Sequence, residues 1–167
     1  MTLPPFEHAV REHGAVVYRV CAAIVGPDDA DDAWSETFLA ALKAYPAIRP
    51  DSDVRAWLVT IAHRKAIDSY RARRRAPVPS EIVPDRVAAA DVAQDRDDAL
   101  AGALTAALRA LPDKQRVAVV CRYLADMAYR DIAELLGSNE AAARRSAADG
   151  IAALRRVHLT DHQKETS

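Results

Sequence analysis

The stretch DSDVRAWLVTIAHRKAIDSYRARRR, residues 51–75, decides how the rest of this chain is organised. Its first half repeats apolar residues at spacings of three and four, namely Val54, Trp57, Leu58, Ile61 and Ala62. This period places them on one side of an α-helix, and Ser52 with Asp53 supplies a cap and a first-turn carboxylate. We therefore predict a long amphipathic helix whose first half packs into a core, with Trp57 as part of that core.

The second half of the same stretch is strongly basic. Between Asp53 and Arg75 the chain carries seven Lys or Arg against two Asp, and four of the arginines fall within Arg71–Arg75. One or two cations at a helix C-terminus only complement the helix dipole and keep that end solvated. The cluster exceeds that need, so we favour a phosphate-binding surface, with simple solvation as the alternative.

Composition indicates a helical protein that gathers its charges in segments. The 167 residues are 50 % hydrophobic, 5 % aromatic and 28 % charged, which is typical of an Ala-rich helical chain of one ordinary or two small domains. The net charge is only −1, yet residues 28–36 carry five carboxylates and no base. Binding of a polyanion must therefore come from segregation of charge and not from the charge of the whole molecule.

Helical periodicity predicts two more helices before the long one. The first runs from Phe6 to about Val25 and ends at Gly26-Pro27, and the second runs from there to about Tyr45. A short loop bracketed by Pro46 and Pro50 leads into the long helix. Three helices with such short connections predict one bundle of about seventy residues.

Residues 76–98 break every helical pattern, because they hold three prolines and a net negative charge. We predict a flexible acidic linker there. Helical periodicity resumes at about Ala99, and Pro112 is expected as the first residue of a further helix. A short helix at 129–136, the turn Gly137-Ser138 and a longer helix at about 139–157 have the shape of a helix-turn-helix, although helical hairpins without DNA function share it. Residues 158–167 are expected to be a tail.

Other classes of function find little support. Cys21 and Cys121 form no CxxC or Cys/His cluster, which argues against structural zinc and favours a reducing cytoplasm. No secretory signal or membrane-spanning run is present. His158 and His162 stand four apart with Asp161 between them, but no third ligand or general base accompanies them. We therefore expect no enzyme, no metal site and no cofactor.

Taken together, four stretches resemble the bacterial extracytoplasmic-function (ECF) sigma factors, which keep only the second and fourth regions of larger sigma factors. The stretches are DADDAWSETFLAALKAYP from Asp29, VRAWLVTIAHRKAIDSYRARRR from Val54, LPDKQRVAVVCRYL from Leu111 and YRDIAELLGSNEAAARRS from Tyr129. The resemblance implies an all-α fold with a three-helix region 2 at 1–75, the linker at 76–98, a four-helix region 4 at 99–157 and the tail.

The resemblance also implies where partners bind. The second helix would dock on a coiled coil of the largest subunit of core RNA polymerase through Asp31, Asp32, Ser35, Glu36 and Leu39. Helix capping by Asp28 and Asp29 beside a solvated face is the alternative. The long helix would recognise and melt the minus-ten promoter element through Arg64, Lys65, Asp68, Arg71, Arg73, Arg74 and Arg75, with the loop 46–52 shaping a pocket for a base.

Region 4 would contact the minus-thirty-five element through Ser138, Asn139, Glu140, Ala142, Arg144 and Arg145. This last helix departs from the family, because Glu140 and Asp149 cancel the two arginines. Phosphate contacts supply much of DNA affinity, so weak binding by this region alone is expected. The implied function is a cytoplasmic promoter-specificity subunit whose partners are core RNA polymerase, promoter DNA and, as a further candidate, an anti-sigma factor. A sigma-like regulator that binds polymerase with weak or lost promoter recognition is the alternative.

Overall fold

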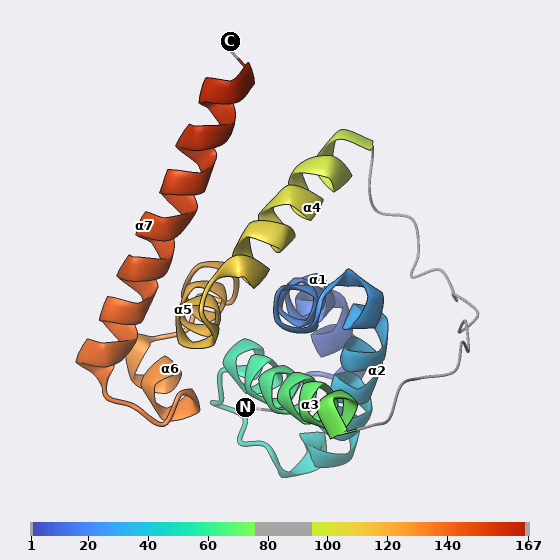
Figure 1. Cartoon of the computed structure of the whole chain (residues 1–167). Coiled ribbons are helices and arrows are strands. Elements are labelled where there is room, and N and C mark those ends of the chain that lie inside the picture. Colours follow the sequence, from blue (N-terminus) through green and yellow to red (C-terminus); the bar gives the residue numbers. More distant parts are fainter. Residues whose placement is uncertain (1, 76–94, 166–167) are drawn as a thin grey trace.

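The computed structural model describes residues 2–75 and 95–165, and within these ranges the side chains of Tyr70, Arg73, Arg74, 95–101 and 159–165 are left undescribed. The first range forms α1 (Phe6–Val25), α2 (Pro27–Ala44), the 3-10 helix η1 (Tyr45–Ala47) and α3 (Val54–Arg75). The second forms α4 (Asp95–Ala110), α5 (Asp113–Val119), the π-helical turn η2 (Val120–Leu124), α6 (Tyr129–Leu135) and α7 (Glu140–Glu165). All regular structure in these ranges is helical, which confirms the all-α prediction (Figure 1).

Local sequence signals explain where the first three helices begin and end. Gly26 takes a φ of 93°, a left-handed value that favours glycine, and so lets the chain turn from α1 into α2. Pro27 occupies the first position of α2, where its missing N–H costs nothing. The Asp53 carboxylate accepts a hydrogen bond of 3.0 Å from the Ala56 N–H, so the predicted cap of α3 is confirmed.

Aromatic side chains hold this three-helix bundle together at one end. The Trp34 indole on α2 donates to the Gly14 carbonyl on α1 at 2.9 Å, and the Tyr45 hydroxyl donates to the Pro4 carbonyl at 2.8 Å. The Tyr45 ring lies 6.3 Å from the Trp57 ring on α3. Trp57 is half-buried and packs against the hydrophobic core, as predicted from its place in the apolar repeat.

The C-terminal end of α1 is enclosed on every side. Its residues Val20, Cys21, Ala22, Ala23 and Ile24 are all buried. Five consecutive residues of a helix point in all directions around its axis, so this end needs packing partners all round. Figure 1 shows α2 and α3 on one side of α1 and α4 and α5 on the other, and α1 contacts all of them as well as η2. The two halves of the chain therefore share one continuous hydrophobic core.

The helix-turn-helix segment has well-formed ends. Gly137 takes a φ of 61°, and the N–H groups of Gly137 and Ser138 donate to the carbonyls of Glu134 and Ala133. This pair of bonds is a Schellman motif, which stops α6 at the predicted Gly137-Ser138 turn. Asn139 then caps α7, because its side-chain oxygen accepts a hydrogen bond of 2.8 Å from the Ala142 N–H.

Three predicted boundaries were wrong. Helix α4 begins at Asp95, inside the predicted linker, because the sequence places Asp95, Asp97 and Asp98 in its first turn, where the helix dipole favours carboxylates. Pro112 is the cap that precedes α5 and not its first residue. Helix α7 continues to Glu165 instead of ending in a tail at Val157, because residues 151–165 contain no Gly or Pro to stop it. The remaining part of the predicted linker, 76–94, lies outside the described residues.

We predict that Gly150→Ala destabilises the protein. A Cβ atom at Gly150 would lie 2.5 Å from a methyl group of Val119 and 3.3 Å from the Gln115 carbonyl oxygen, so α5 and α7 would be forced apart. Overpacking of this kind costs about 1–3 kcal/mol, whereas Ala in place of Gly within a helix gains about 1 kcal/mol. Urea denaturation should therefore give a lower free energy of unfolding for the variant.

Gly102→Ala is the matched control, because a Cβ there meets no atom within 4 Å. This variant should gain about 0.5–1 kcal/mol of stability from helix propensity alone. A Gly150→Ala protein as stable as the Gly102→Ala protein would contradict the close packing of α5 on α7.

Candidate nucleic-acid and polymerase interfaces

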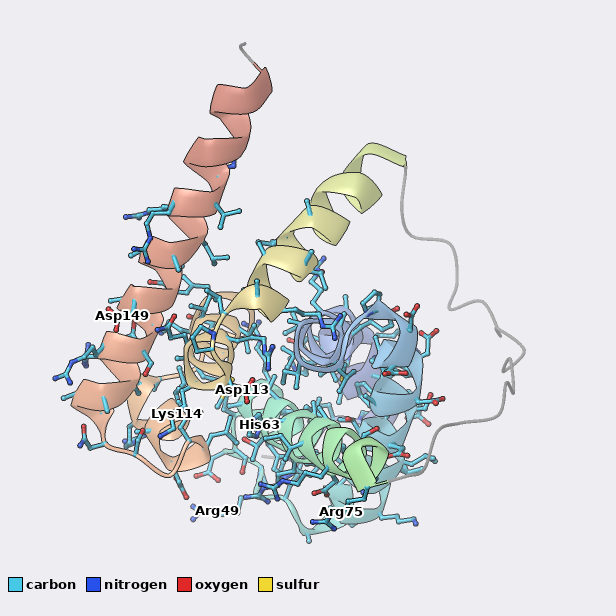
Figure 2. All side chains as sticks on the ribbon, in the orientation of Figure 1. Arg49, His63, Arg75, Asp113, Lys114 and Asp149 are labelled. Atoms are coloured by element: carbon cyan, nitrogen blue, oxygen red, sulfur yellow. The ribbon has the colours of Figure 1, made fainter. Side chains whose placement is uncertain are left out.

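The basic half of α3 presents a charged strip to solvent. Arg64, Asp68 and Arg71 are exposed and follow one another at spacings of four and three, so they share one face of the helix. Arg75, four residues further on, continues this face at the end of α3 (Figure 2). Lys65 is half-buried beside the strip. Arg73 and Arg74 lie on the helical backbone of α3, but their side chains are outside the described part of the chain.

A groove of about 590 Å³ runs along this strip and continues onto the helix-turn-helix. Its wall on α3 is lined by Ala56, Trp57, Thr60, His63, Arg64, Ile67, Asp68 and Arg71. Its other wall consists of Met127, Asp131, Glu134 and Leu135. Arg64 and Arg71 therefore line the same groove as Asp131 and Glu134, which places carboxylates of α6 near the strip that sequence reasoning assigned to DNA. The residues that line the groove include none from the loop 46–52, where Arg49 and Asp51 form an exposed ion pair with N–O distances of 3.0 and 3.1 Å.

His63 lies at the floor of this groove and is only 7 % exposed. Its Nδ1 atom is buried and has no hydrogen-bond partner among the described residues. Burial lowers the pKa of His63, and the neighbouring Arg64 guanidinium lowers it further. His13 on α1 is also buried, and burial is likewise the main cause of its lowered pKa. Both imidazoles are thus favoured as neutral groups in the folded protein.

The acidic face of α2 points away from the bundle. Asp31, Asp32, Ser35 and Glu36 are exposed, whereas Ala30, Ala33, Thr37 and Ala41 on the other side of the helix are buried. Leu39 is 60 % exposed beside these carboxylates, and Leu42 is 52 % exposed one turn away. Asp31, Asp32 and Glu36 lie beyond the first turn of α2, so helix capping does not account for them. The result is an apolar strip edged by negative charge, which suits a basic partner surface.

The residues predicted to contact the minus-thirty-five element lie at the start of α7 and just before it. Ser138, Asn139, Glu140, Arg144 and Arg145 are exposed, and Ala142 is half-buried. Asn139 serves as the helix cap, and Arg144 forms an ion pair with Glu140 one turn before it. The Arg144 guanidinium also lies 4.7 Å from the centroid of the Tyr129 ring. The pairing with Glu140 neutralises one of the two arginines near the start of this helix.

Metal-ligating side chains do not cluster in the part of the chain that the structure describes. These residues contain no group of three or more His, Cys, Asp or Glu able to hold a metal ion. Burial raises the pKa of Cys21 to about 11 and that of Cys121 to about 12, so both thiols are protonated at neutral pH. The side chain of His162, one of the pair considered as metal ligands, is outside the described residues. None of the described helices is long and apolar enough to cross a membrane.

Comparison with known proteins agrees with this arrangement. Two family models match the chain, Sigma-70 region 2 over residues 9–76 and Sigma-70 region 4 over residues 101–154. The ECF RNA polymerase sigma factor SigE of Mycolicibacterium smegmatis is 31 % identical over 172 residues, which cover 99 % of this chain and 65 % of SigE. SigJ of Mycobacterium tuberculosis is 33 % identical over 157 residues, which cover 88 % of this chain and 48 % of SigJ.

The chain belongs to the ECF sigma factors. It spans less than two thirds of the length of the two relatives just described. Two solved structures have the same fold as this ECF chain. CnrH in complex with the cytosolic domain of CnrY has a TM-score of 0.67 and 22 % identity, with coverage of 93 % of this chain and 88 % of CnrH. The sigma factor RpoE of Bartonella quintana in complex with the anti-sigma factor NepR has a TM-score of 0.72 and 19 % identity. The match covers 93 % of this chain and 98 % of RpoE.

Sequence reasoning missed several residues that shape these surfaces in the ECF chain. Met127, Asp131 and Glu134 complete the groove along α3, and no helical period relates them to it. Tyr129 was noted only as the start of a helix, although its ring contacts two arginines. His63 is buried, which the apolar repeat of α3 alone does not predict. By contrast, the cap function of Asn139 could have been predicted from the sequence, since Asn is a favoured residue directly before a helix.

We predict that the protein loses stability as the pH falls below about 6.5, the usual pKa of an unfolded histidine. Because burial lowers the pKa of His63 and His13 in the folded state, the unfolded chain binds more protons in this range. Their contribution to stability is fully present above pH 6.5 and is lost as the pH falls from there through the folded pKa values.

Urea denaturation between pH 7 and 5 measures this slope, and His63→Gln should make it shallower because that imidazole is then absent. Proton NMR of the His63 ring provides a direct check. A ring that titrates at or above pH 6.5 in the folded protein would contradict the assignment.

Proposed function

We propose that this chain is a promoter-specificity subunit that binds core bacterial RNA polymerase in the cytoplasm and directs transcription initiation. The observation that carries the proposal is the exposed basic strip of α3 joined, in one chain of the ECF sigma family, to a capped helix-turn-helix. The working units are region 2 at 1–75, a linker at 76–98 and region 4 at 99–157. Residues 95–98 of this linker form the first turn of α4.

In this proposal α2 is the main contact with polymerase. Its exposed Leu39 supplies apolar area, and Asp31, Asp32 and Glu36 around it select a basic partner. Interfaces commonly combine an apolar centre with a charged rim of this kind. Ser35 lies on the same exposed face and adds a hydroxyl to it.

The strip on α3 would hold the displaced DNA strand of the minus-ten element. Arg64, Arg71 and Arg75 would bind its phosphates, and Lys65, Asp68, Arg73, Arg74 and the loop 46–52 would complete the surface. Asp131 and Glu134 line the same groove, so their carboxylates would repel phosphates held at the strip. Movement of α6 away from α3 would therefore favour DNA binding there.

The segment α6–α7 would enter the major groove at the minus-thirty-five element, with Ser138, Asn139, Glu140, Ala142, Arg144 and Arg145 at or near the DNA. An anti-sigma factor is a further proposed partner, because the related RpoE was solved with an anti-sigma factor. A regulator that binds polymerase without recognising promoters well is the second candidate. The ion pair between Arg144 and Glu140 favours that candidate, since it removes one positive charge from the helix that faces DNA.

Run-off transcription by core polymerase tests the proposal. Wild-type protein should yield a discrete product from the promoter regions of its own operon, and core alone should yield none. The double variant Arg71→Ala/Arg75→Ala should reduce the product by about tenfold or more, because the loss of two phosphate contacts weakens strand holding. The double variant Arg11→Ala/Arg19→Ala removes two exposed arginines of α1 outside the proposed surfaces and should leave the product unchanged.

Three other outcomes would count against the proposal. Tight binding to core without any initiation on operon or genomic fragments would favour the polymerase-binding regulator. Absence of core binding would overturn both candidates. An equal loss of product in the two double variants would mean that general charge, and not the strip on α3, is responsible.

We also predict that Glu36→Lys weakens binding to core polymerase by about tenfold or more. A lysine there would oppose the basic partner surface, and like charges placed together across an interface cost several kcal/mol, where about 1.4 kcal/mol corresponds to tenfold. Glu7→Lys makes the same charge change at an exposed site of α1 and serves as the control. Equal affinities of the two variants for core, measured by titration of labelled protein, would contradict a role for α2.

A further inference from the structure

Two adjacent arginines of α7, Arg144 and Arg145, have different surroundings. The side of α7 that packs on the rest of region 4 is marked by the buried residues Ala143, Ala147 and Gly150. A helix advances about 100° per residue, and Arg145 stands two residues from both Ala143 and Ala147. Arg145 therefore points about 160–200° away from the buried side, directly outward. Arg144 stands one residue from Ala143 and so projects from the flank of the helix.

On that flank Arg144 is held by two intramolecular contacts. Its guanidinium pairs with the Glu140 carboxylate and lies 4.7 Å from the centroid of the Tyr129 ring on α6. A second guanidinium, that of Arg122, lies 5.1 Å from the same centroid and donates to the Met127 carbonyl at 3.0 Å. Tyr129 is itself half-buried, so its ring is a fixed surface for both cations. This cluster of Arg122, Tyr129, Arg144 and Glu140 ties α7 to α6.

The Arg145 side chain is not held by contacts of this kind. It is exposed and makes no ion pair, hydrogen bond or ring contact with any other residue that the structure describes. Two of its neighbours on the outward side, Ala141 and Ala148, are small and exposed. Small neighbours let a helix approach the edges of base pairs closely, and the Arg145 side chain is then the longest group on that side.

We propose that Arg145, and not Arg144, is the residue of α7 that specifies a base, and that it recognises a guanine through the O6 and N7 acceptors in the major groove. A guanidinium makes two parallel hydrogen bonds to that pair of acceptors, and this is the commonest base-specific contact in protein–DNA complexes. Arg144 acts through position, because its stack on Tyr129 fixes the angle at which α7 leaves α6. This inference rests on the proposed function, in which α7 enters the major groove.

Asp149 supports the assignment to a base instead of a phosphate. It lies on α7 one turn after Arg145 and is exposed. Four residues correspond to about 40° around a helix, so it projects close to the same outward direction. A carboxylate on this side repels the DNA backbone, so the outward side is poorly suited to phosphate binding. Toward base edges, however, a carboxylate can accept a hydrogen bond from cytosine N4.

The test is selection of DNA by the assembled holoenzyme, core polymerase with the full chain, from promoters whose minus-thirty-five element is randomised. Wild-type protein should enrich a guanine at one position or more. Arg145→Ala should reduce that preference by about five- to a hundredfold, the range for loss of one bidentate base contact. Arg145→Lys keeps the charge but lacks the planar fork, so it should retain overall affinity and lose the preference.

Arg144→Ala should keep the preferred base, lower the affinity for all sequences alike because α7 is then held less firmly, and lower the melting temperature of the free protein. Tyr129→Leu should behave in the same way because it removes the surface that holds Arg144, and Tyr129→Phe should restore wild-type behaviour because the ring is kept. Thermal melting of Arg145→Ala should match wild type, since that side chain is exposed.

If Arg144→Ala abolishes the base preference while Arg145→Ala keeps it, the inference is wrong although the proposed function stands. If wild-type holoenzyme initiates transcription but enriches no base in the randomised element, the role assigned to α7 is wrong and the inference falls with it. If neither arginine variant changes an enrichment that wild type does show, other residues of α7 specify the base and the inference is again overturned.

Discussion

The structure depends on the burial of one helix end. Residues 20–24 of α1 are all buried, and no two-helix or three-helix arrangement on one side can cover a helix in every direction. Helices α2 and α3 cover part of it, and α4, α5 and η2 cover the rest. Full burial of an aliphatic side chain contributes about 1.5–3 kcal/mol, so this end is a substantial reason for the two halves to associate. The Arg109 side chain of α4 also packs against Gly26, where a Cβ would lie 2.9 Å from its guanidinium carbon.

This association has a direct electrostatic consequence. Because α1 brings the two halves together, α6 comes to form the second wall of the groove along α3. Asp131 and Glu134 then line the same groove as Arg64 and Arg71, so opposite charges lie near one another in a chain whose net charge is only −1. In a chain whose strip on α3 binds DNA, these carboxylates would repel phosphates from that groove. The apolar contacts around α1 therefore also affect how accessible the strip on α3 is.

The helix-turn-helix illustrates how neighbouring residues of one type acquire different surroundings. Arg144 and Arg145 differ by one step of about 100° around α7, and that step decides which of them meets Tyr129. The Schellman turn at Gly137 and the Asn139 cap fix where α7 begins, and so fix which residues face outward.

The sequence by itself determined the local structure of this protein. Hydrophobic period, prolines, glycines and capping residues predicted the first three helices closely, as well as the turn at Gly137 and the strip of like charge on α3, because these signals act over a few residues. They misjudged both ends of the C-terminal region, since α4 starts at Asp95 and α7 continues to Glu165 where polar composition suggested a linker and a tail. Family resemblance supplied the assignments to polymerase and promoter, which remain predictions.

Only the tertiary structure decided how distant residues meet. The enclosure of α1, the groove between α3 and α6, the burial of His63 and the contact of Tyr129 with Arg144 each join segments far apart in the chain. Periodicity states which face of a helix is buried but not which partner buries it, because burial is indifferent to the identity of the apolar neighbour. Partner choice follows from the shape of the whole core, and that shape exists only once the helices of the described residues are packed together.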